Sequence, residues 1–291
     1  MKRINLVWHI MALITVMIWG TTFVSTKYLI NNGIGPIEIM VFRFFIAYII
    51  LFAACPKIKF ISLKEEIKFI VMGITGGTLY FITENNAIGH TFASNVALIV
   101  CMAPVLTAVL AHFFTKDEKL KITIVVGFFI AMLGIAIIIF NGKFILKLSP
   151  IGDVLALCSA LSWAFYSILL KNIGEKYNYI FITKKILFYS LLTSLPFLFF
   201  TKGEISYNII FRYDILLNLI FLGVVASALC YIIWHNAINK IGMIVSSNYI
   251  YLSPLITVIA SKIIIKENIS LLTVIGGIFI ISGVLIAQMK K

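Results

Sequence analysis

The sequence predicts an all-α polytopic membrane protein with ten transmembrane helices, arranged as two five-helix inverted repeats. Its 291 residues are 62% hydrophobic and only 12% charged, whereas a soluble domain is typically ~45–50% apolar and ~25% charged. So few charges cannot cover a water-facing surface, which points to lipid as the surrounding solvent. A series of long apolar segments and an ordered internal repeat supply the helix count and the topology.

Each apolar segment is long enough to cross the ~30 Å hydrocarbon core of a bilayer as an α-helix, which needs ~20 residues. Continuous apolar runs favour helices over membrane-spanning strands, which alternate and are shorter. Gly, Asn, Pro or Lys punctuates most of the short connections. The expected helices cover residues 8–30, 36–55, 67–88, 91–113 and 121–141, then 152–171, 181–201, 215–237, 243–263 and 270–289.

The distribution of Lys and Arg predicts the orientation. The net charge of +13 would suggest nucleic acid in a soluble protein, but here the basic residues lie in short connections and form no stripe with interleaved aromatics. If the N-terminus is cytoplasmic, most of them fall on the cytoplasmic side, clearly in the first half and more weakly in the second. We therefore expect a multi-pass protein of the cell inner (cytoplasmic) membrane with both termini cytoplasmic.

The second half of the chain repeats the first, which predicts two domains over residues 1–146 and 147–291. The matches are Asn86-Ala87-Ile88 with Asn236-Ala237-Ile238, Pro104 with Pro254, Gly127 with Gly277, Trp19 with Trp163 and Lys27 with Lys171. Each repeat holds five helices, and an odd number inverts the second copy in the membrane. Inverted repeats are typical of secondary transporters, in which two similar halves expose a midplane site to each side in turn.

Several short motifs add a family resemblance that extends over essentially the whole chain. They are Trp19-Gly20-Thr21-Thr22-Phe23-Val24, Arg43-Phe44-Phe45, the proline of the fourth helix and Lys116-Asp117-Glu118. With the five-plus-five layout, the chain resembles the drug/metabolite transporter (DMT) superfamily, specifically its ten-helix EamA-type permeases. The resemblance implies a central cavity between the repeats and, frequently, export of amino acids or related metabolites. The second repeat departs from the pattern at Trp163-Ala164 and at Lys184-Lys185, and the substrate does not carry over.

Ionisable side chains inside the predicted helices are costly in lipid, so each is a functional candidate. Glu84 is the sharpest, as a proton-coupling group or the partner of a cationic substrate moiety; the alternative is a hydrated carboxylate near the interface. His235 is a candidate for the same functional role, because its unperturbed pKa is close to neutral. The alternative, which is the more common situation, is a histidine at a helix end that faces water. Arg43 and Lys27 suit a substrate carboxylate, but pairing of Arg43 with Glu38 and snorkelling of Lys27 are favoured.

Aromatic and amide side chains are expected to line a central cavity, because they combine apolar faces with hydrogen-bonding edges. An interfacial aromatic belt is the alternative for those near helix ends. Pro104 and Pro254 are expected to kink the fourth and ninth helices and are hinge candidates. The predicted substrate-binding residues are Trp19, Thr22, Tyr80, Glu84, Asn85, Asn95, Trp163, Tyr166, Trp234, His235, Asn248 and Tyr251.

Other functional classes find less support. A membrane-embedded enzyme needs a nucleophile with its base or a metal-ligand cluster, and the four histidines are scattered, as are the four cysteines, which form no Cys-x-x-Cys. A non-transporting receptor is the other alternative, against which the inverted repeat argues. We expect a secondary transporter with no enzymatic activity, cofactor, metal or nucleic acid. Its expected partners are a small-molecule substrate, the lipid bilayer and protons, and it is expected to be a monomer or weak dimer.

Overall fold

The computed structural model describes residues 2–56, 61–90, 93–115, 121–140, 149–173, 176–200, 207–265, 271–287 and 289. All regular secondary structure in these ranges is helical, and it forms ten membrane-length or near-membrane-length segments in the predicted order. The all-α fold predicted from composition and apolar segments is therefore confirmed.

The first half of the chain forms five of these segments. They are α1 (Lys2–Asn31), α2 (Pro36–Ala54), α3–η1–α4 (Leu63–Gly73, Ile74–Thr78, Leu79–His90), α5–α6 (Ala93–Val100, Ala103–Phe114) and α7 (Ile122–Phe140). The second half forms the other five, with a short helix α10 (Tyr207–Ile210) that the sequence did not predict. They are α8 (Pro150–Ile173), α9–η2 (Tyr179–Ser194, Leu195–Phe200), α11–η3–α12 (Tyr213–Ile220, Phe221–Leu229, Cys230–Ile241), α13–η4–α14 (Met243–Asn248, Tyr249–Leu252, Ser253–Ile265) and α15 (Leu271–Ala287).

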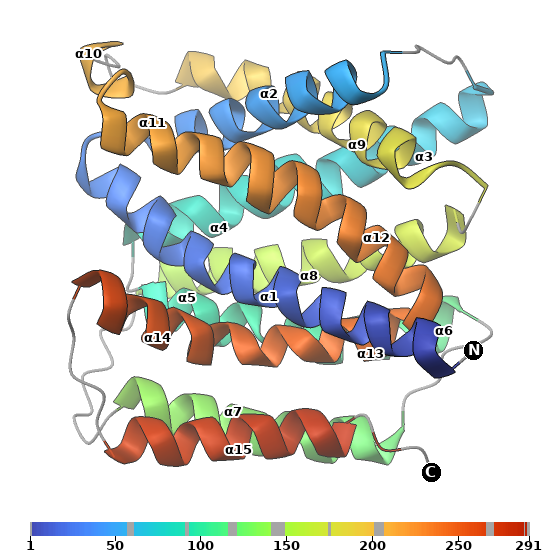
Figure 1. The fold of residues 1–291 in the computed structure, drawn as a ribbon, viewed down its shortest axis with the longest axis vertical. Coiled ribbons are helices and arrows are strands. Elements are labelled where there is room, and N and C mark those ends of the chain that lie inside the picture. Colours follow the sequence, from blue (N-terminus) through green and yellow to red (C-terminus); the bar gives the residue numbers. More distant parts are fainter. Residues whose placement is uncertain are drawn as a thin grey trace.

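Successive segments run in alternating directions, so corresponding segments of the two halves point opposite ways. In Figure 1, α1 runs away from the edge of the molecule at which both chain termini lie, whereas its counterpart α8 runs toward that edge. We call this edge the terminal end and the opposite edge the far end. The antiparallel relation of equivalent segments is the inverted topology that the odd number of helices predicts.

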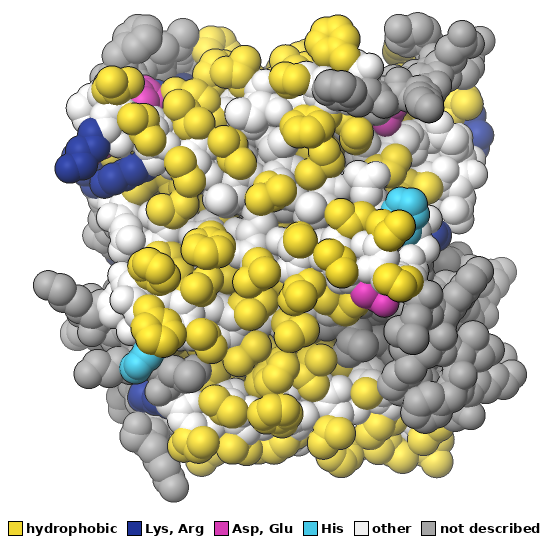
Figure 2. Space-filling model, turned by 180° about the vertical axis from the view of Figure 1, so that it is seen from behind, with side chains coloured by type: hydrophobic (Ala, Val, Ile, Leu, Met, Phe, Trp, Pro, Cys, Tyr) yellow, Lys and Arg dark blue, Asp and Glu magenta, His cyan; other side chains and the backbone are white. Residues whose placement is uncertain are grey.

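The outer surface is apolar. Figure 2 shows hydrophobic side chains spread over this face of the bundle, with only a few charged side chains in view. Phe129 in α7 and Leu285 in α15 are both 62% exposed. Exposure of such apolar side chains is unfavourable in water but not in lipid. Within the ranges given above, five helices are long and apolar enough to span a membrane: Leu6–Asn31, Pro36–Ala54, Pro150–Ile173, Tyr179–Phe199 and Tyr213–Ile241. Shorter apolar helices lie at Ala103–Phe114, Ile122–Ile137 and Val274–Ala287.

The third and eighth segments carry π-helical turns at corresponding places. The first, η1, covers Ile74–Thr78, and the second, η3, covers Phe221–Leu229. When the two repeats are aligned without gaps so that Pro104 matches Pro254, the residues of η1 correspond to residues inside η3. Short π-turns within longer helices are rare and frequently mark functional sites.

The fourth and ninth segments are broken beside their prolines. A turn at Cys101–Met102 separates α5 from α6, and the 3-10 turn η4 separates α13 from α14. Pro104 lies in the first turn of α6, where it has no helical hydrogen bond to remove. Pro254 lies in the same place in α14. Where the sequence predicts a kink inside each helix, the structure thus has a break directly before each proline, and the half-helices α6 and α14 begin near the middle of their segments.

The last helices of the two repeats, α7 and α15, pack tightly against each other along one side of the bundle (Figure 1). Their glycines make this possible in reciprocal fashion. A Cβ on Gly127 would lie 2.5 Å from the carbonyl oxygen of Gly283, and a Cβ on Gly283 would lie 2.6 Å from that of Gly127. Small residues permit such close backbone approach between membrane helices.

Candidate functional site

A cavity lies between the two repeats, in the middle of the bundle and toward its far end. Its volume is about 570 Å³, including space that opens outward. The first repeat supplies Trp19, Thr22 and Phe23 from α1, Arg43 from α2, Tyr80, Phe81 and Glu84 from α4, Ala97 and Val100 from α5, and Cys101 and Ala103 around the break in the fourth segment. The second repeat contributes Trp163 from α8, Tyr231 from α12, and Ile250 and Ser253 around the break in the ninth.

Arg43 is the cationic group of this cavity. Its side chain is 2% exposed and its Nε donates a hydrogen bond of 3.0 Å to Ser227 Oγ in η3. The guanidinium carbon lies 4.0 Å from the centre of the Phe81 ring, a cation–π contact. Among the residues that the structure describes, no carboxylate oxygen lies within ion-pair distance of Arg43, which lines the cavity.

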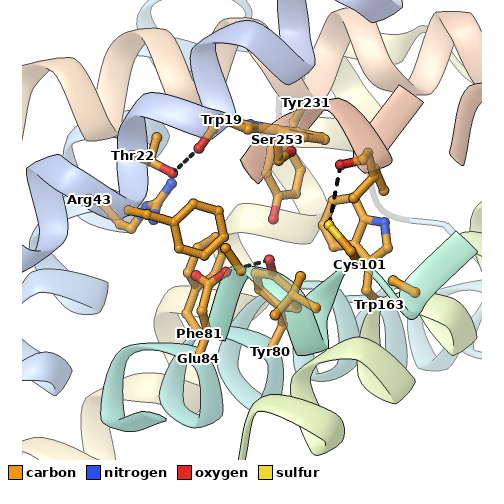
Figure 3. Close-up of a pocket in the computed structure, with 15 residues that line it drawn as sticks. Trp19, Thr22, Arg43, Tyr80, Phe81, Glu84, Cys101, Trp163, Tyr231 and Ser253 are labelled. Atoms are coloured by element: carbon orange, nitrogen blue, oxygen red, sulfur yellow. Dashed lines mark hydrogen bonds between the residues drawn. The ribbon is translucent and has the colours of Figure 1, made fainter. Parts of the chain in front are cut away.

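Glu84 is the anionic group of the same cavity. It is 6% exposed and its Oε1 accepts a hydrogen bond of 2.6 Å from the Tyr80 hydroxyl one turn earlier in α4. Figure 3 shows Glu84 and Tyr80 together on one side of the cavity, with Arg43 and Phe81 adjacent. A buried cation and a buried carboxylate thus face one space without forming an ion pair with each other.

Aromatic rings form the opposite wall. Trp19 packs edge-on against Trp163 with ring centroids 5.3 Å apart, and its indole Nε1 donates 2.9 Å to the carbonyl oxygen of Ala226 in η3. The Tyr231 hydroxyl donates 2.8 Å to the carbonyl oxygen of Gly76 in η1. In a π-turn the carbonyls are not all engaged by the helix itself, so both turns hold cavity-wall aromatics in place.

Behind the aromatic wall lies a buried polar chain centred on His235. The ring is fully buried, its Nε2 accepts from the Tyr166 hydroxyl, and its Nδ1 lies 2.9 Å from Thr183 Oγ1. Thr183 in turn donates 2.8 Å to the carbonyl oxygen of Tyr179. These directions assign the proton of a neutral ring to Nδ1. His235 therefore joins α8, α9 and α12 within the second repeat.

Of the twelve predicted substrate-binding residues, five line the cavity: Trp19, Thr22, Tyr80, Glu84 and Trp163. Six others are buried outside it: Asn85, Tyr166, Trp234, His235, Asn248 and Tyr251. Asn85 donates a hydrogen bond of 3.0 Å to the carbonyl oxygen of Pro36, and the tilted ring of Trp234 packs against Trp19 with ring centroids 4.9 Å apart. Asn95 belongs to α5, but its side chain lies outside the described part of the structure.

Three of the alternatives weighed from the sequence differ from what the structure shows. Arg43 bonds Ser227 rather than pairing with Glu38, because the π-turn η3 brings Ser227 beside α2. His235 is buried among polar partners and does not face water. Lys27 does not snorkel to the headgroups; its ammonium donates 2.9 Å to the carbonyl oxygen of Ile88.

Sequence reasoning missed several residues of the cavity. Phe81 and Tyr231 occupy matching positions in the two repeats, so the internal alignment contained the signal for this pair. Ala103 and Ser253 likewise match and directly precede Pro104 and Pro254, whose placement at helix breaks could have suggested them.

The fold and its two halves are shared with known proteins. The EamA-like transporter family matches residues 6–140 and again residues 150–289. An uncharacterized transporter of Archaeoglobus fulgidus is 24% identical, covering 97% of this chain and 98% of its own. The uncharacterized transporter YyaM of Bacillus subtilis is 28% identical over 99% of this chain and 95% of its own. A solved crystal structure, 14% identical, superposes with a TM-score of 0.78 over 97% of this chain and 98% of that one, and it shows the shared fold.

Two matches to one family, one on each half, coincide with two antiparallel sets of helices around a central cavity. The chain belongs to the EamA-like transporter family and is a multi-pass membrane transporter.

Proposed function

We propose that the protein is a secondary transporter that exports a small zwitterionic metabolite, an amino acid or related compound, across the cytoplasmic membrane. It works by alternating access and is coupled to protons through Glu84, with both chain termini cytoplasmic. The observation that carries this proposal is the pair of oppositely charged, mutually unpaired side chains, Arg43 and Glu84, that face one cavity.

Arg43 suits a substrate carboxylate. A guanidinium offers several donors in a fixed plane and binds carboxylates through two parallel hydrogen bonds. Ser227 and the Phe81 ring fix the orientation of the side chain and leave its terminal Nη groups toward the cavity. A buried cation without a protein anion is costly, and a bound carboxylate offsets that cost.

Glu84 suits the ammonium group of the same substrate. Tyr80 engages one carboxylate oxygen and leaves the other available. The aromatic wall of Trp19, Trp163 and Tyr231 supplies the apolar surface that a side chain of the substrate contacts.

Proton coupling follows from competition for Glu84. With the termini cytoplasmic, the cavity extends toward the outer side of the membrane. A proton from outside that neutralises Glu84 removes the partner of the substrate ammonium and favours release. When the site next faces the cytoplasm, a new substrate displaces that proton inward. This order of events drives export with the proton gradient.

The test is metabolite profiling of the medium of cells that overexpress the wild type, Arg43→Gln or Arg212→Gln. Arg212 is the matched control because it is an exposed arginine paired with Asp214. We expect a zwitterionic compound to accumulate outside with the wild type and with Arg212→Gln, but not with Arg43→Gln. Depletion of a compound from the medium would contradict export, and an accumulating compound without a carboxylate would contradict the assignment of Arg43.

A further inference from the structure

We infer that the terminal half of the protein contains a second section of the substrate route, closed in this structure and lined by the neutral polar side chains of Ser247, Asn248 and Trp234. This section takes the hydrogen-bonding groups of a polar small molecule without ionic contacts. The inference rests on the proposed alternating-access function and names the residues that would line the opposite state.

The repeat relation locates this section. Ala97 and Glu84 line the cavity from α5 and α4, and in the gap-free alignment their counterparts are Ser247 in α13 and Trp234 in α12. Both counterparts are fully buried. The helices that carry them, with α6 and α8, pack together between the cavity and the terminal end (Figure 1). The repeat relation therefore matches the open cavity of the far half with a closely packed region in the terminal half.

The chemistry of this closed section distinguishes it from ordinary packing. The hydroxyl of Ser247, both polar atoms of the Asn248 amide and the Trp234 indole Nε1 are buried and have no hydrogen-bond partner within the described part of the chain. The indole Nε1 of Trp163, at the border with the cavity, is in the same condition. Buried polar groups in native proteins are nearly all hydrogen-bonded, and each exception calls for an explanation. Exposure to water or substrate in a second conformation explains all of these groups together.

Neighbouring Ser246 provides the contrast. It is equally buried on the same short helix, but its hydroxyl donates 2.8 Å to the carbonyl oxygen of Gly242. Its counterpart in the first repeat, Val96, is buried and does not line the cavity. Lack of a hydrogen-bond partner is thus not a property of α13 as a whole. It is found at Ser247, whose counterpart lines the cavity, and at its neighbour Asn248.

The test is cysteine accessibility in the full-length protein in sealed membranes, with the four native cysteines replaced by serine. Single cysteines are placed as Ala97→Cys, Ser247→Cys and Ser246→Cys, and a membrane-impermeant thiol reagent is applied to one face at a time. We expect Ala97→Cys to react only from the far end. Ser247→Cys should react only from the terminal end, at ~0.1–10% of the rate of an exposed thiol, because a minor conformer is populated to about that extent. Ser246→Cys should stay unreactive from both faces.

Trapping supplies the second measurement. Prior modification of Ala97→Cys from the far end, in a protein that also carries Ser247→Cys, should abolish labelling at the terminal end because both states cannot be open at once. An unreactive Ser247→Cys, or labelling from the same face as Ala97→Cys, overturns the inference, and Asn248→Cys repeats the test if the first variant fails to express. None of these readouts needs flux, so a failed search for the exported metabolite leaves this result interpretable.

Discussion

The hydroxyl of Thr257 donates a hydrogen bond of 2.7 Å to the carbonyl oxygen of Gly20 and thereby joins α14 to α1. The counterpart of Thr257 in the first repeat is Thr107 in α6, and the counterpart of Gly20 is Ala164 in α8. Thr107 is fully buried and its hydroxyl has no hydrogen-bond partner among the described residues. The same residue therefore makes its contact in one repeat and not in the other, so the two repeats have different conformations.

Removing either hydroxyl should shift the balance between the two states in opposite directions. In the exchanged state we expect Thr107 to bond Ala164 and Thr257 to lose its bond to Gly20. Thr257→Val should then raise the labelling rate of Ser247→Cys, and Thr107→Val should lower it, each ~2- to 10-fold for a net hydrogen bond of ~0.5–1.5 kcal/mol. Shifts of the same sign in both variants would contradict a reciprocal exchange.

Glu84→Gln should abolish flux driven by a pH gradient, because an amide occupies the same space but exchanges no proton. The measurement is substrate flux in proteoliposomes under an imposed gradient, with protein yield as the check on folding. Glu38→Gln is the matched control, since Glu38 is also buried in the first repeat but does not line the cavity. Unchanged flux in Glu84→Gln would remove this residue from the coupling step.

His235→Ala should lower the thermal stability of the detergent-solubilised protein. The substitution leaves the Tyr166 hydroxyl buried without its acceptor, at a cost of about 1–3 kcal/mol, and removes a large buried side chain as well. The melting temperature should fall clearly below that of His112→Ala, a control at an exposed histidine. Tyr166→Phe in the His235→Ala background should cost less than in the wild type, because the two residues share one interaction.

Glu65 should contribute to stability only above acidic pH. It lies at the start of α3, outside the predicted membrane-spanning part, and the ammonium of Lys176 and the hydroxyl of Tyr177 lower its pKa below the ordinary 4.5. A carboxyl with a lowered pKa stabilises the fold fully above its ordinary pKa, and the contribution is lost as the pH falls through the lower folded value. Glu65→Gln should thus lower the melting temperature slightly at neutral pH and equal the wild type in strong acid. A difference that persists at low pH would show that packing, not charge, matters there.

The sequence was sufficient for the helices and insufficient for most side-chain partners. Apolar length predicted the ten segments because membrane helices satisfy their backbone locally. The breaks near Pro104 and Pro254 also follow from local chemistry. The partner of Arg43 could not be predicted, because Ser227 is 184 residues away in the chain and reaches it only through a π-turn. Glu38, which is close to Arg43 in the sequence, was the expected partner, but in the folded protein Arg43 bonds Ser227 instead.

The π-turn η1 divides the third segment into two parts with different neighbours. Before the turn, α3 contacts α9 and carries Glu65, which binds Lys176; after it, α4 carries Tyr80 and Glu84 to the cavity. The eighth segment is divided in the same way by η3. In the third segment the π-turn is thus the boundary between a part that anchors the helix and a part that faces the cavity, and it is the natural junction for a chimera with a relative.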